Sequence, residues 1–239
     1  MTLEPPFNFL QSMDSQECRP VDMLHSPVSP SLESGVHLDQ YSLGDYGPGA
    51  PLWQQLLWYY IGSPVIKSSL LPFSGLKVQI LRWFGAKLGQ GVRIKPGLQV
   101  KFPWRLTVGD HCWLGEQVWI DNIAAVTIGD HVCISQNAYL CTGNHDWSDP
   151  HFSLRLGPIV LESESWVAAR AIVGPGVTVG QGAILSLGSV ALRSLEAMTI
   201  YVGNPATPVK KRVIQASEAG EGKQHNQPRR KNEQNGNGQ

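Results

Sequence analysis

The chain has 239 residues with 19 Lys plus Arg and 19 Asp plus Glu, so its formal net charge is zero, and only 16% of its residues are charged. A neutral chain without a basic excess excludes general nucleic-acid binding, which depends on neutralising phosphates. No apolar run reaches the ~18 residues of a membrane-spanning helix, and the N-terminus lacks the basic and apolar regions of a secretion signal.

Residues 1–50 form a lead that we expect to be disordered, because prolines, glycines and polar residues interrupt every apolar period. Residues 51–87 are apolar and aromatic, and part of this segment follows helical spacing. It predicts a cap of one or two short helices, broken at Pro64 and Pro72, that packs on the main domain. The alternative for this segment is peripheral docking on a membrane surface, since Trp and Tyr favour that interface.

From Leu88 onward an aliphatic residue recurs every six positions, with two short insertions and one long interruption. The fifteen positions are all Leu, Ile or Val except the last, which is Ala. They are Leu88, Ile94, Val100, Val108, Leu114, Ile120, Ile128, Ile134, Leu140, Leu161, Val167, Val173, Val179, Leu185 and Ala191. A six-residue period is typical of a parallel β-helix, in which each hexad supplies a short strand and a turn. Residues 88–195 therefore predict an all-β triangular prism with the aliphatic residues stacked inside.

Two segments follow the prism. Residues 196–216 are expected to form a C-terminal turn and helix. Residues 217–239 are expected to be a disordered tail, because a composition rich in Gln, Asn and Gly buries no core. Four cysteines show neither CxxC nor zinc-like spacing: Cys18, Cys112, Cys133 and Cys141. They are predicted to be free thiols in a reducing cytoplasm.

The long interruption of the repeat, residues 144–158, exceeds any turn, and such loops are usually functional or disordered. It opens with Asn144, His145 and Asp146. A neutral imidazole can take a proton from a hydroxyl near neutral pH, so His145 is the candidate general base. Asp146 either orients the ring or shapes the loop. Shaping is favoured, because neighbours in sequence do not always face each other.

Three other reactive side chains lie in the repeat. His111 and His131 occupy matching Gly-Asp-His segments twenty residues apart, so we expect them to stack at one corner of the coil. Exposed turn residues are the favoured interpretation of this pair, and zinc binding is the alternative. Cys141 precedes His145 by four residues. It is interpreted as a structural thiol, with a Cys–His nucleophile pair as the alternative.

Three motifs accompany the repeat: Cys-Thr-Gly-Asn-His-Asp-Trp-Ser-Asp-Pro at 141–150, Trp-Val-Ala-Ala-Arg-Ala at 166–171 and Val-Gly-Asn-Pro-Ala at 202–206. Together they resemble the left-handed β-helix, hexapeptide-repeat acyltransferases. Within that family the chain is most similar to the colanic acid biosynthesis acetyltransferases, and also resembles the maltose, galactoside and nodulation O-acetyltransferases. The resemblance covers roughly residues 52–214 and implies a left-handed coil.

The resemblance further implies an acetyl-CoA-dependent O-acetyltransferase, assembled as a homotrimer with each active site between adjacent prisms. His145 would deprotonate a hydroxyl of a sugar or glycan precursor, which would attack the thioester directly, without a metal. Asn122 is the candidate for holding this acceptor. Trp166 would line the pantetheine channel. The other implied cofactor positions are the backbone of Ala169 and Ser186 beside the cofactor arm, and the cations of Arg193 and Lys210 near the phosphates.

Two other functions remain open. A zinc hydratase of the γ-carbonic anhydrase type would use histidines among His111, His131, His145 and His151. A non-catalytic scaffold would result if Leu187, which is bulkier than the Ala usual beside the cofactor, closed the groove.

Overall fold

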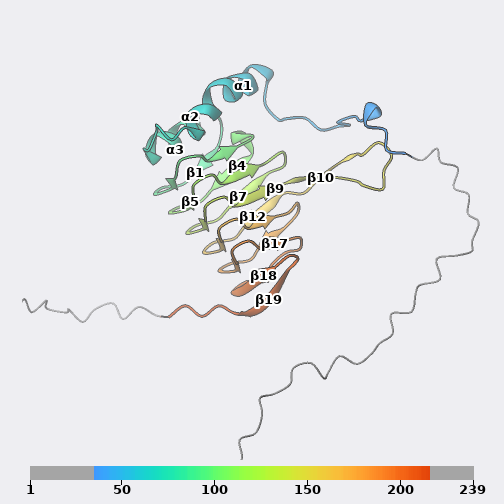
Figure 1. Cartoon of the computed structure of the whole chain (residues 1–239). Helices are drawn as coiled ribbons and strands as arrows, with labels where there is room; N and C mark the ends of the chain where they lie inside the picture. The colour runs from blue at the N-terminus through green and yellow to red at the C-terminus, as the bar shows by residue number, and fades with distance from the viewer. Residues whose placement is uncertain (1–34, 216–239) are drawn as a thin grey trace, which may run out of the picture.

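The computed structural model describes residues 35–215, and its main body is a parallel β-solenoid (Figure 1). The chain visits three sheets in turn, and each passage adds one strand to each sheet. The first sheet contains β1 (Lys87–Leu88), β4 (Leu106–Val108), β7 (Val126–Ile128), β12 (Ile159–Leu161) and β15 (Thr178–Val179). The second contains β2 (Arg93–Ile94), β5 (Trp113–Leu114), β8 (Cys133–Ile134), β13 (Trp166–Val167), β16 (Ile184–Leu185), β18 (Thr199–Gly203) and β19 (Ala206–Lys211). The third contains β3 (Gln99–Val100), β6 (Trp119–Asp121), β9 (Tyr139–Cys141), β14 (Ile172–Val173) and β17 (Val190–Ala191).

The core is the stack of aliphatic residues that the repeat predicts. All fifteen positions are buried, none more than 9% exposed, and they lie in register from strand to strand. Leu140, for example, pairs with Ile120 on one side and Val173 on the other. Burying each such side chain stabilises the fold by about 1.5–3 kcal/mol relative to exposure. The predicted all-β prism of stacked coils is confirmed.

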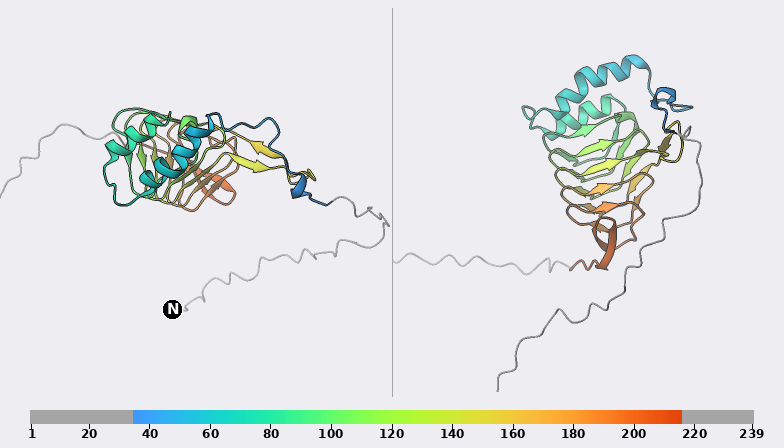
Figure 2. Two further views of the ribbon diagram at one scale, coloured as in Figure 1. Left: turned by 90° about the horizontal axis from the view of Figure 1, so that it is seen from above. Right: turned by 45° about the vertical axis from the view of Figure 1, so that its right-hand side comes forward.

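The cap covers the N-terminal end of the prism (Figure 2). It consists of α1 (Leu52–Leu57), a π-helical turn η2 (Trp58–Gly62), α2 (Ser63–Lys67) and α3 (Ser74–Trp83). The predicted break at Pro64 is wrong, because the helical path continues through the π-turn: the Ser63 N–H donates to the Trp58 carbonyl. Pro64 directly follows this π-turn, at the start of α2. No helix within residues 35–215 is both long and apolar enough to cross a bilayer.

Part of the lead predicted as disordered is an ordered strap, residues 35–50, which includes the 3-10 helix η1 (Leu38–Gln40). Near the cap, the Trp104 indole N–H, in the 3-10 helix η3 (Pro103–Arg105), donates to the Pro48 carbonyl at 2.7 Å. Farther along, the His37 N–H donates to the Pro150 carbonyl at 2.8 Å. The prediction of disorder was wrong here because it considered only apolar periodicity. The strap is instead held by hydrogen bonds from its backbone to residues far away in the chain. Residues 1–34 and the predicted tail at 217–239 lie outside the described residues.

The expected C-terminal helix is also wrong. Residues 199–211 instead form the antiparallel hairpin β18–β19, with β18 continuing the second sheet beyond β16. The β-branched residues Thr199, Ile200 and Val202 favour extended backbone. A strand placed here also satisfies backbone groups that an uncovered edge of the second sheet would leave unpaired.

Candidate active site

The long interruption of the repeat forms a hairpin that projects from one corner of the prism (Figures 1 and 2). It leaves the third sheet after β9 and returns to the first sheet at β12. Its strands β10 (Gly143–His145) and β11 (Leu154–Leu156) pair antiparallel, with His145 opposite Leu154. The hairpin therefore stands at the corner between the third and first sheets, opposite the outer face of the second sheet.

His145 is held at the end of β10 by the hairpin itself. Its Nδ1 lies 2.7 Å from the Phe152 carbonyl oxygen. A carbonyl only accepts hydrogen bonds, so Nδ1 carries the proton and the neutral ring keeps its lone pair on Nε2. Among residues 35–215 no hydrogen bond reaches Nε2. The half-buried His145 side chain thus presents an unprotonated nitrogen to whatever enters the site.

Two aromatic rings fix the plane of the imidazole. The Phe152 ring stacks on it with centroids 4.2 Å apart and planes 10° apart, and Tyr41 meets it edge-on with centroids 5.7 Å apart. Phe152 adopts a left-handed backbone conformation, φ 52°, which bends the returning chain toward the histidine. Sequence reasoning missed both residues. Tyr41 comes from the strap, far from the hairpin in the chain, and no local pattern signals the contact.

Asp146 shapes the hairpin, as favoured from the sequence. Its carboxylate accepts hydrogen bonds from the Ser148 amide at 3.0 Å and hydroxyl at 2.6 Å, and pairs with the Arg155 guanidinium at 2.5 Å. The Ser148 hydroxyl, followed by Arg155, lowers the pKa of Asp146 to about 2. Because the folded-state pKa is depressed, this contribution to stability is present above the usual carboxyl pKa of about 3.9 and is lost as pH falls toward 2. The hairpin contacts of Asp146 therefore persist throughout the neutral range.

Replacing Asp146 with Asn should leave the pH dependence of catalysis in place. The carboxylate binds Ser148 and Arg155 rather than the imidazole, and exposed ion pairs contribute little. We expect kcat/KM of Asp146→Asn to fall by no more than about fivefold, with the acidic limb of its pH profile unmoved. An acidic limb displaced by a full pH unit would show that Asp146 acts on the ring.

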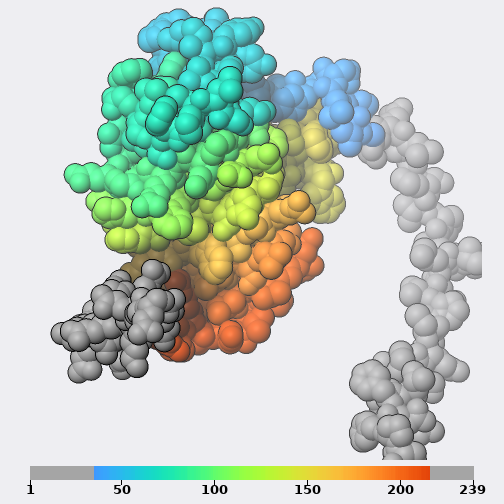
Figure 3. Space-filling model, turned by 60° about the vertical axis from the view of Figure 1, so that its left-hand side comes forward, coloured from blue at the N-terminus to red at the C-terminus, as the bar shows by residue number. Residues whose placement is uncertain are grey.

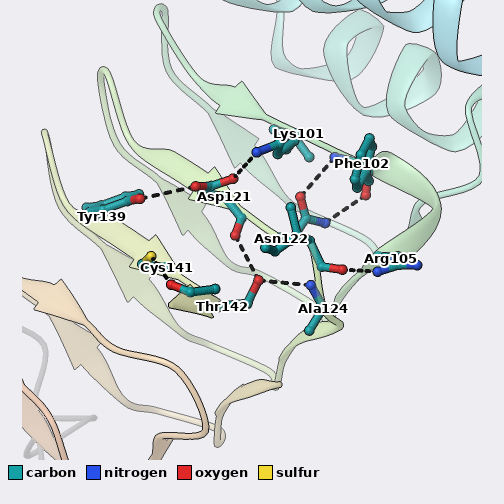
Figure 4. Close-up of polar contacts among 12 residues, drawn as sticks. Lys101, Phe102, Arg105, Asp121, Asn122, Ala124, Tyr139, Cys141 and Thr142 are labelled. Atoms are coloured by element: carbon teal, nitrogen blue, oxygen red, sulfur yellow. Dashed lines mark hydrogen bonds and ion pairs between the residues drawn. The ribbon is translucent and has the colours of Figure 1, made fainter. Parts of the chain in front are cut away.

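Asn122 does not hold an acceptor, contrary to the prediction. Its side chain is fully buried, where its Oδ1 accepts from the Phe102 N–H at 2.9 Å and its Nδ2 donates to the Phe102 carbonyl at 2.7 Å (Figure 4). It thus ties one coil to the preceding one at the corner where β6 ends. Sequence alone does not separate this role from a site residue, because the partner is backbone of another coil.

Asn122→Ala should accordingly reduce stability without changing acceptor binding. It removes two hydrogen bonds and leaves the Phe102 N–H and carbonyl unpaired, so we expect a loss of about 1–3 kcal/mol in the free energy of unfolding. Thermal denaturation measures the loss, and steady-state kinetics should show an unchanged KM for the acceptor. The exposed Gln79→Ala in α3 is the control, expected within about 0.5 kcal/mol of the parent. A raised KM with normal stability would restore the original assignment.

The root of the hairpin is fixed by a second polar cluster at the same corner (Figure 4). The buried Thr142 hydroxyl donates to the Asp121 carbonyl at 2.8 Å and accepts from the Ala124 N–H at 2.9 Å. The Asp121 carboxylate lies between Lys101 Nζ at 3.0 Å and the Tyr139 hydroxyl at 3.1 Å. Burial raises the pKa of Tyr139, so its hydroxyl remains a donor at neutral pH. These bonds hold β9 and the chain that enters β10.

The implied cofactor residues divide between two sides of the prism. Trp166 points outward from the second sheet and is 41% exposed. Ala169 and Ser186 lie on successive coils at the corner between the second and third sheets, where the Gly188 N–H donates to the Ala169 carbonyl at 2.9 Å. Lys210 is exposed on β19, which extends the second sheet. Arg193 instead follows β17, at the corner that carries the hairpin. One chain therefore does not bring His145 and Trp166 together.

The second sheet carries a cavity of about 570 Å³ beside Trp166 that sequence reasoning did not identify. Its lining includes Arg93, Trp113, Cys133 and Ser135, and the Trp166 indole N–H donates to the Ser135 hydroxyl at 2.9 Å. The repeat contained a signal for this surface. The residue before each stacked aliphatic points outward, so Arg93, Trp113, Cys133 and Trp166 form one column in register.

The other candidate groups lie elsewhere. His111 and His131 stack as predicted, with ring centroids 5.3 Å apart, at the corner between the first and second sheets. His145 and His151 are on the hairpin, so the four histidines do not converge within one chain. Among the described residues no group of three His, Cys, Asp or Glu side chains is arranged to bind a metal. The Cys141 thiol donates to the Gly143 carbonyl at 3.1 Å, and among the described residues no hydrogen bond joins it to His145.

Comparison with known proteins gives the family. No family model matches the chain. It is 38% identical over 157 residues, 66% of this chain and 86% of the relative, to an Escherichia coli protein named as the colanic acid biosynthesis acetyltransferase WcaF. It is 23% identical over 52% of its length, and 63% of the relative's, to the galactoside O-acetyltransferase of the same species.

Solved structures share the fold. A hexapeptide-repeat acetyltransferase from Vibrio cholerae, complexed with acetyl coenzyme A, superposes with a TM-score of 0.58 at 22% identity, covering 68% of this chain and 85% of that one. A maltose O-acetyltransferase from Clostridium difficile gives a TM-score of 0.58 at 19% identity, covering 69% and 90%. Because it is 38% identical to a relative of which it covers 86%, and shares the fold of these structures, the chain belongs to the hexapeptide-repeat acetyltransferase family.

Proposed function

We propose that the protein transfers the acetyl group of acetyl-CoA to a hydroxyl of a sugar or glycan precursor, with His145 as the general base. The observation that carries this proposal is the hydrogen bond from Nδ1 of His145 to the Phe152 carbonyl, which leaves Nε2 free to accept a proton. Family membership supports the acetyl transfer, and relatives named as galactoside and maltose O-acetyltransferases support a sugar hydroxyl as acceptor.

The reaction balances with His145 as the carrier of a single proton. Nε2 takes the proton of the acceptor hydroxyl while the hydroxyl oxygen bonds to the acetyl carbon. His145 then returns this proton to the sulfur of coenzyme A as the carbon–sulfur bond breaks. Asp146 holds the hairpin in shape, and Phe152 keeps the tautomer, so the ring needs no reorientation between the two transfers.

We propose that the working enzyme is a homotrimer with each site formed between two copies. His145 stands opposite the outer face of the second sheet of its own chain, and Trp166 lies on that face. A neighbouring copy is therefore required to bring a hairpin histidine to a second-sheet column. The division of the cofactor positions between these two sides supports the same arrangement.

The cavity on the second sheet is the proposed acceptor pocket. Trp113 is 53% exposed, with the Arg93 guanidinium 5.1 Å from the centre of its ring, and the rest of its indole surface suits the apolar face of a sugar ring. Arg93, Ser135 and Gln136 supply polar groups around it for sugar hydroxyls. Leu187 is 75% exposed at a coil corner, so it fills no cavity of its own chain.

The direct experiment is a coupled assay of the full chain with acetyl-CoA and a panel of sugars and nucleotide sugars. We expect thiol release that depends on one class of acceptor, and mass spectrometry should find one acetyl group on that acceptor. Absence of thiol release across the panel, with the protein folded and assembled, would contradict the proposal.

We also propose a cytoplasmic location, which the free thiols of Cys112, Cys133 and Cys141 support.

A further inference from the structure

The outer surface of the cap is apolar and aromatic. Trp53, Tyr60, Phe73 and Trp83 are 66–71% exposed, and Leu70 between α2 and α3 is 94% exposed. Large exposed apolar surfaces on soluble proteins are typical of sites that bind a partner or a membrane. We name the surface formed by Trp53, Tyr59, Tyr60, Leu70, Phe73 and Trp83 the cap face.

The helical run from α1 to α2 is apolar on both sides. One stripe, Trp58, Gly62 and Ile66, packs on the prism, and the Trp58 indole donates to the Val100 carbonyl at 3.1 Å. The other side carries Trp53, Tyr60 and their exposed neighbours, and no charged residue occurs from Pro51 to Ile66. A helix that is apolar all round is normally buried, so its outer side lacks a partner in the single chain.

The charged residues of the cap segment, residues 51–87, are all positive. The sequence has no Asp or Glu between Asp45 and Asp110, whereas Lys67, Arg82 and Lys87 are exposed in α2, α3 and β1. The overall charge of zero therefore conceals a basic end of the prism. Figure 3 shows the cap at the end of the molecule opposite the C-terminal strands.

We propose that the cap face docks in the interfacial layer of a bilayer that contains anionic lipid. Trp and Tyr side chains prefer the headgroup region, and juxtaposed Lys and Arg are attracted to anionic lipid. The helices lie across the end of the prism (Figure 2) and are too short to span, which suits a surface-bound cap. A second copy is a poorer occupant. Contact between two caps would bring Lys67, Arg82 and Lys87 close to the same cations of the other copy, and these like charges repel.

The test is co-sedimentation of the full chain with vesicles and involves no acetyl transfer, so its outcome is independent of the proposed reaction. We expect binding to phosphatidylcholine vesicles containing about one quarter phosphatidylglycerol, and at least about tenfold weaker binding to pure phosphatidylcholine. High salt should weaken the binding because it screens the exposed cations.

Two variants separate the aromatic and charge contributions. The double variant Trp53→Ala/Tyr60→Ala should reduce partitioning at least tenfold, as should Lys67→Glu/Lys87→Glu. Their matched controls are Trp147→Ala, which removes an 85% exposed indole from the hairpin, and Lys210→Glu at the opposite end of the prism. Both controls should bind vesicles like the parent chain. Circular dichroism and gel filtration verify folding and assembly of each variant.

Three results would overturn the proposal. One is no binding of the parent chain to anionic vesicles. Another is equal loss of binding in the hairpin control and the aromatic double variant. The third is a smaller oligomer for the aromatic double variant, which would assign the cap face to a second copy of the chain.

Discussion

His145→Ala is expected to lower kcat/KM for acetyl transfer by about 10²–10⁴-fold, the usual contribution of a general base. The loss should appear mainly in kcat, because the imidazole acts on the hydroxyl proton as the bond to the acetyl carbon forms. His145→Gln should be equally inactive, although its amide can still donate to the Phe152 carbonyl, since it has no basic nitrogen. Thiol release from acetyl-CoA in the presence of an accepted sugar measures both variants.

The same hairpin provides the control. His151 is exposed, with its ring Nδ1 3.3 Å from Asp149 Oδ1, and among the described residues no hydrogen bond or aromatic pair joins it to His145. His151→Ala should keep kcat/KM within about threefold of the parent. If His145→Ala retained more than about a tenth of the parent activity while folded and assembled, the general-base assignment would be wrong.

The largest effect on stability is expected from the core. Leu140 is fully buried between Ile120 and Val173, at the coil from which the hairpin leaves. Leu140→Ala removes packed methyl groups and leaves a cavity, so we expect a loss of about 2–5 kcal/mol in the free energy of unfolding. At about 2–4 °C per kcal/mol for a chain of this size, Tm should fall by roughly 4–20 °C.

Leu187→Ala is the matched control for this substitution. Leu187 is 75% exposed at a coil corner, and the same change there should alter stability by no more than about 0.5 kcal/mol. Thermal denaturation at one fixed protein concentration compares the two, since assembly makes Tm depend on concentration. Equal, small shifts for both variants would contradict the stacked core.

The repeat made the prism predictable because the six-residue period directly records which side chains point inward. The inward-pointing positions from Leu88 to Ala191 could be predicted without knowledge of the tertiary structure, since every coil repeats the same environment. The C-terminal hairpin was not predictable in this way. Its strands follow the last hexad, and their pairing depends on the open edge that β16 leaves.

The candidate site was predictable only in part. His145 and its loop were singled out because the hairpin interrupts the repeat, and the contacts of Asp146 agree with the shaping role favoured from the sequence. The ring nitrogen of His145 that carries the proton could not be predicted from the sequence. It depends on the pairing register of the hairpin, which brings the Phe152 carbonyl back to the ring. Asn122 was misassigned since a buried amide that binds backbone resembles a site amide in sequence.

The central claim is that His145 of one copy serves the second-sheet pocket of the next. Co-expression of two differently tagged inactive chains tests it most directly: His145→Ala, and Cys133→Trp, which fills the pocket. In a three-fold ring every mixed trimer has one interface with an intact histidine and an intact pocket. Purified mixed assemblies should therefore recover about one third of the parent activity. Mixed trimers as inactive as either parent variant would contradict a site shared between copies.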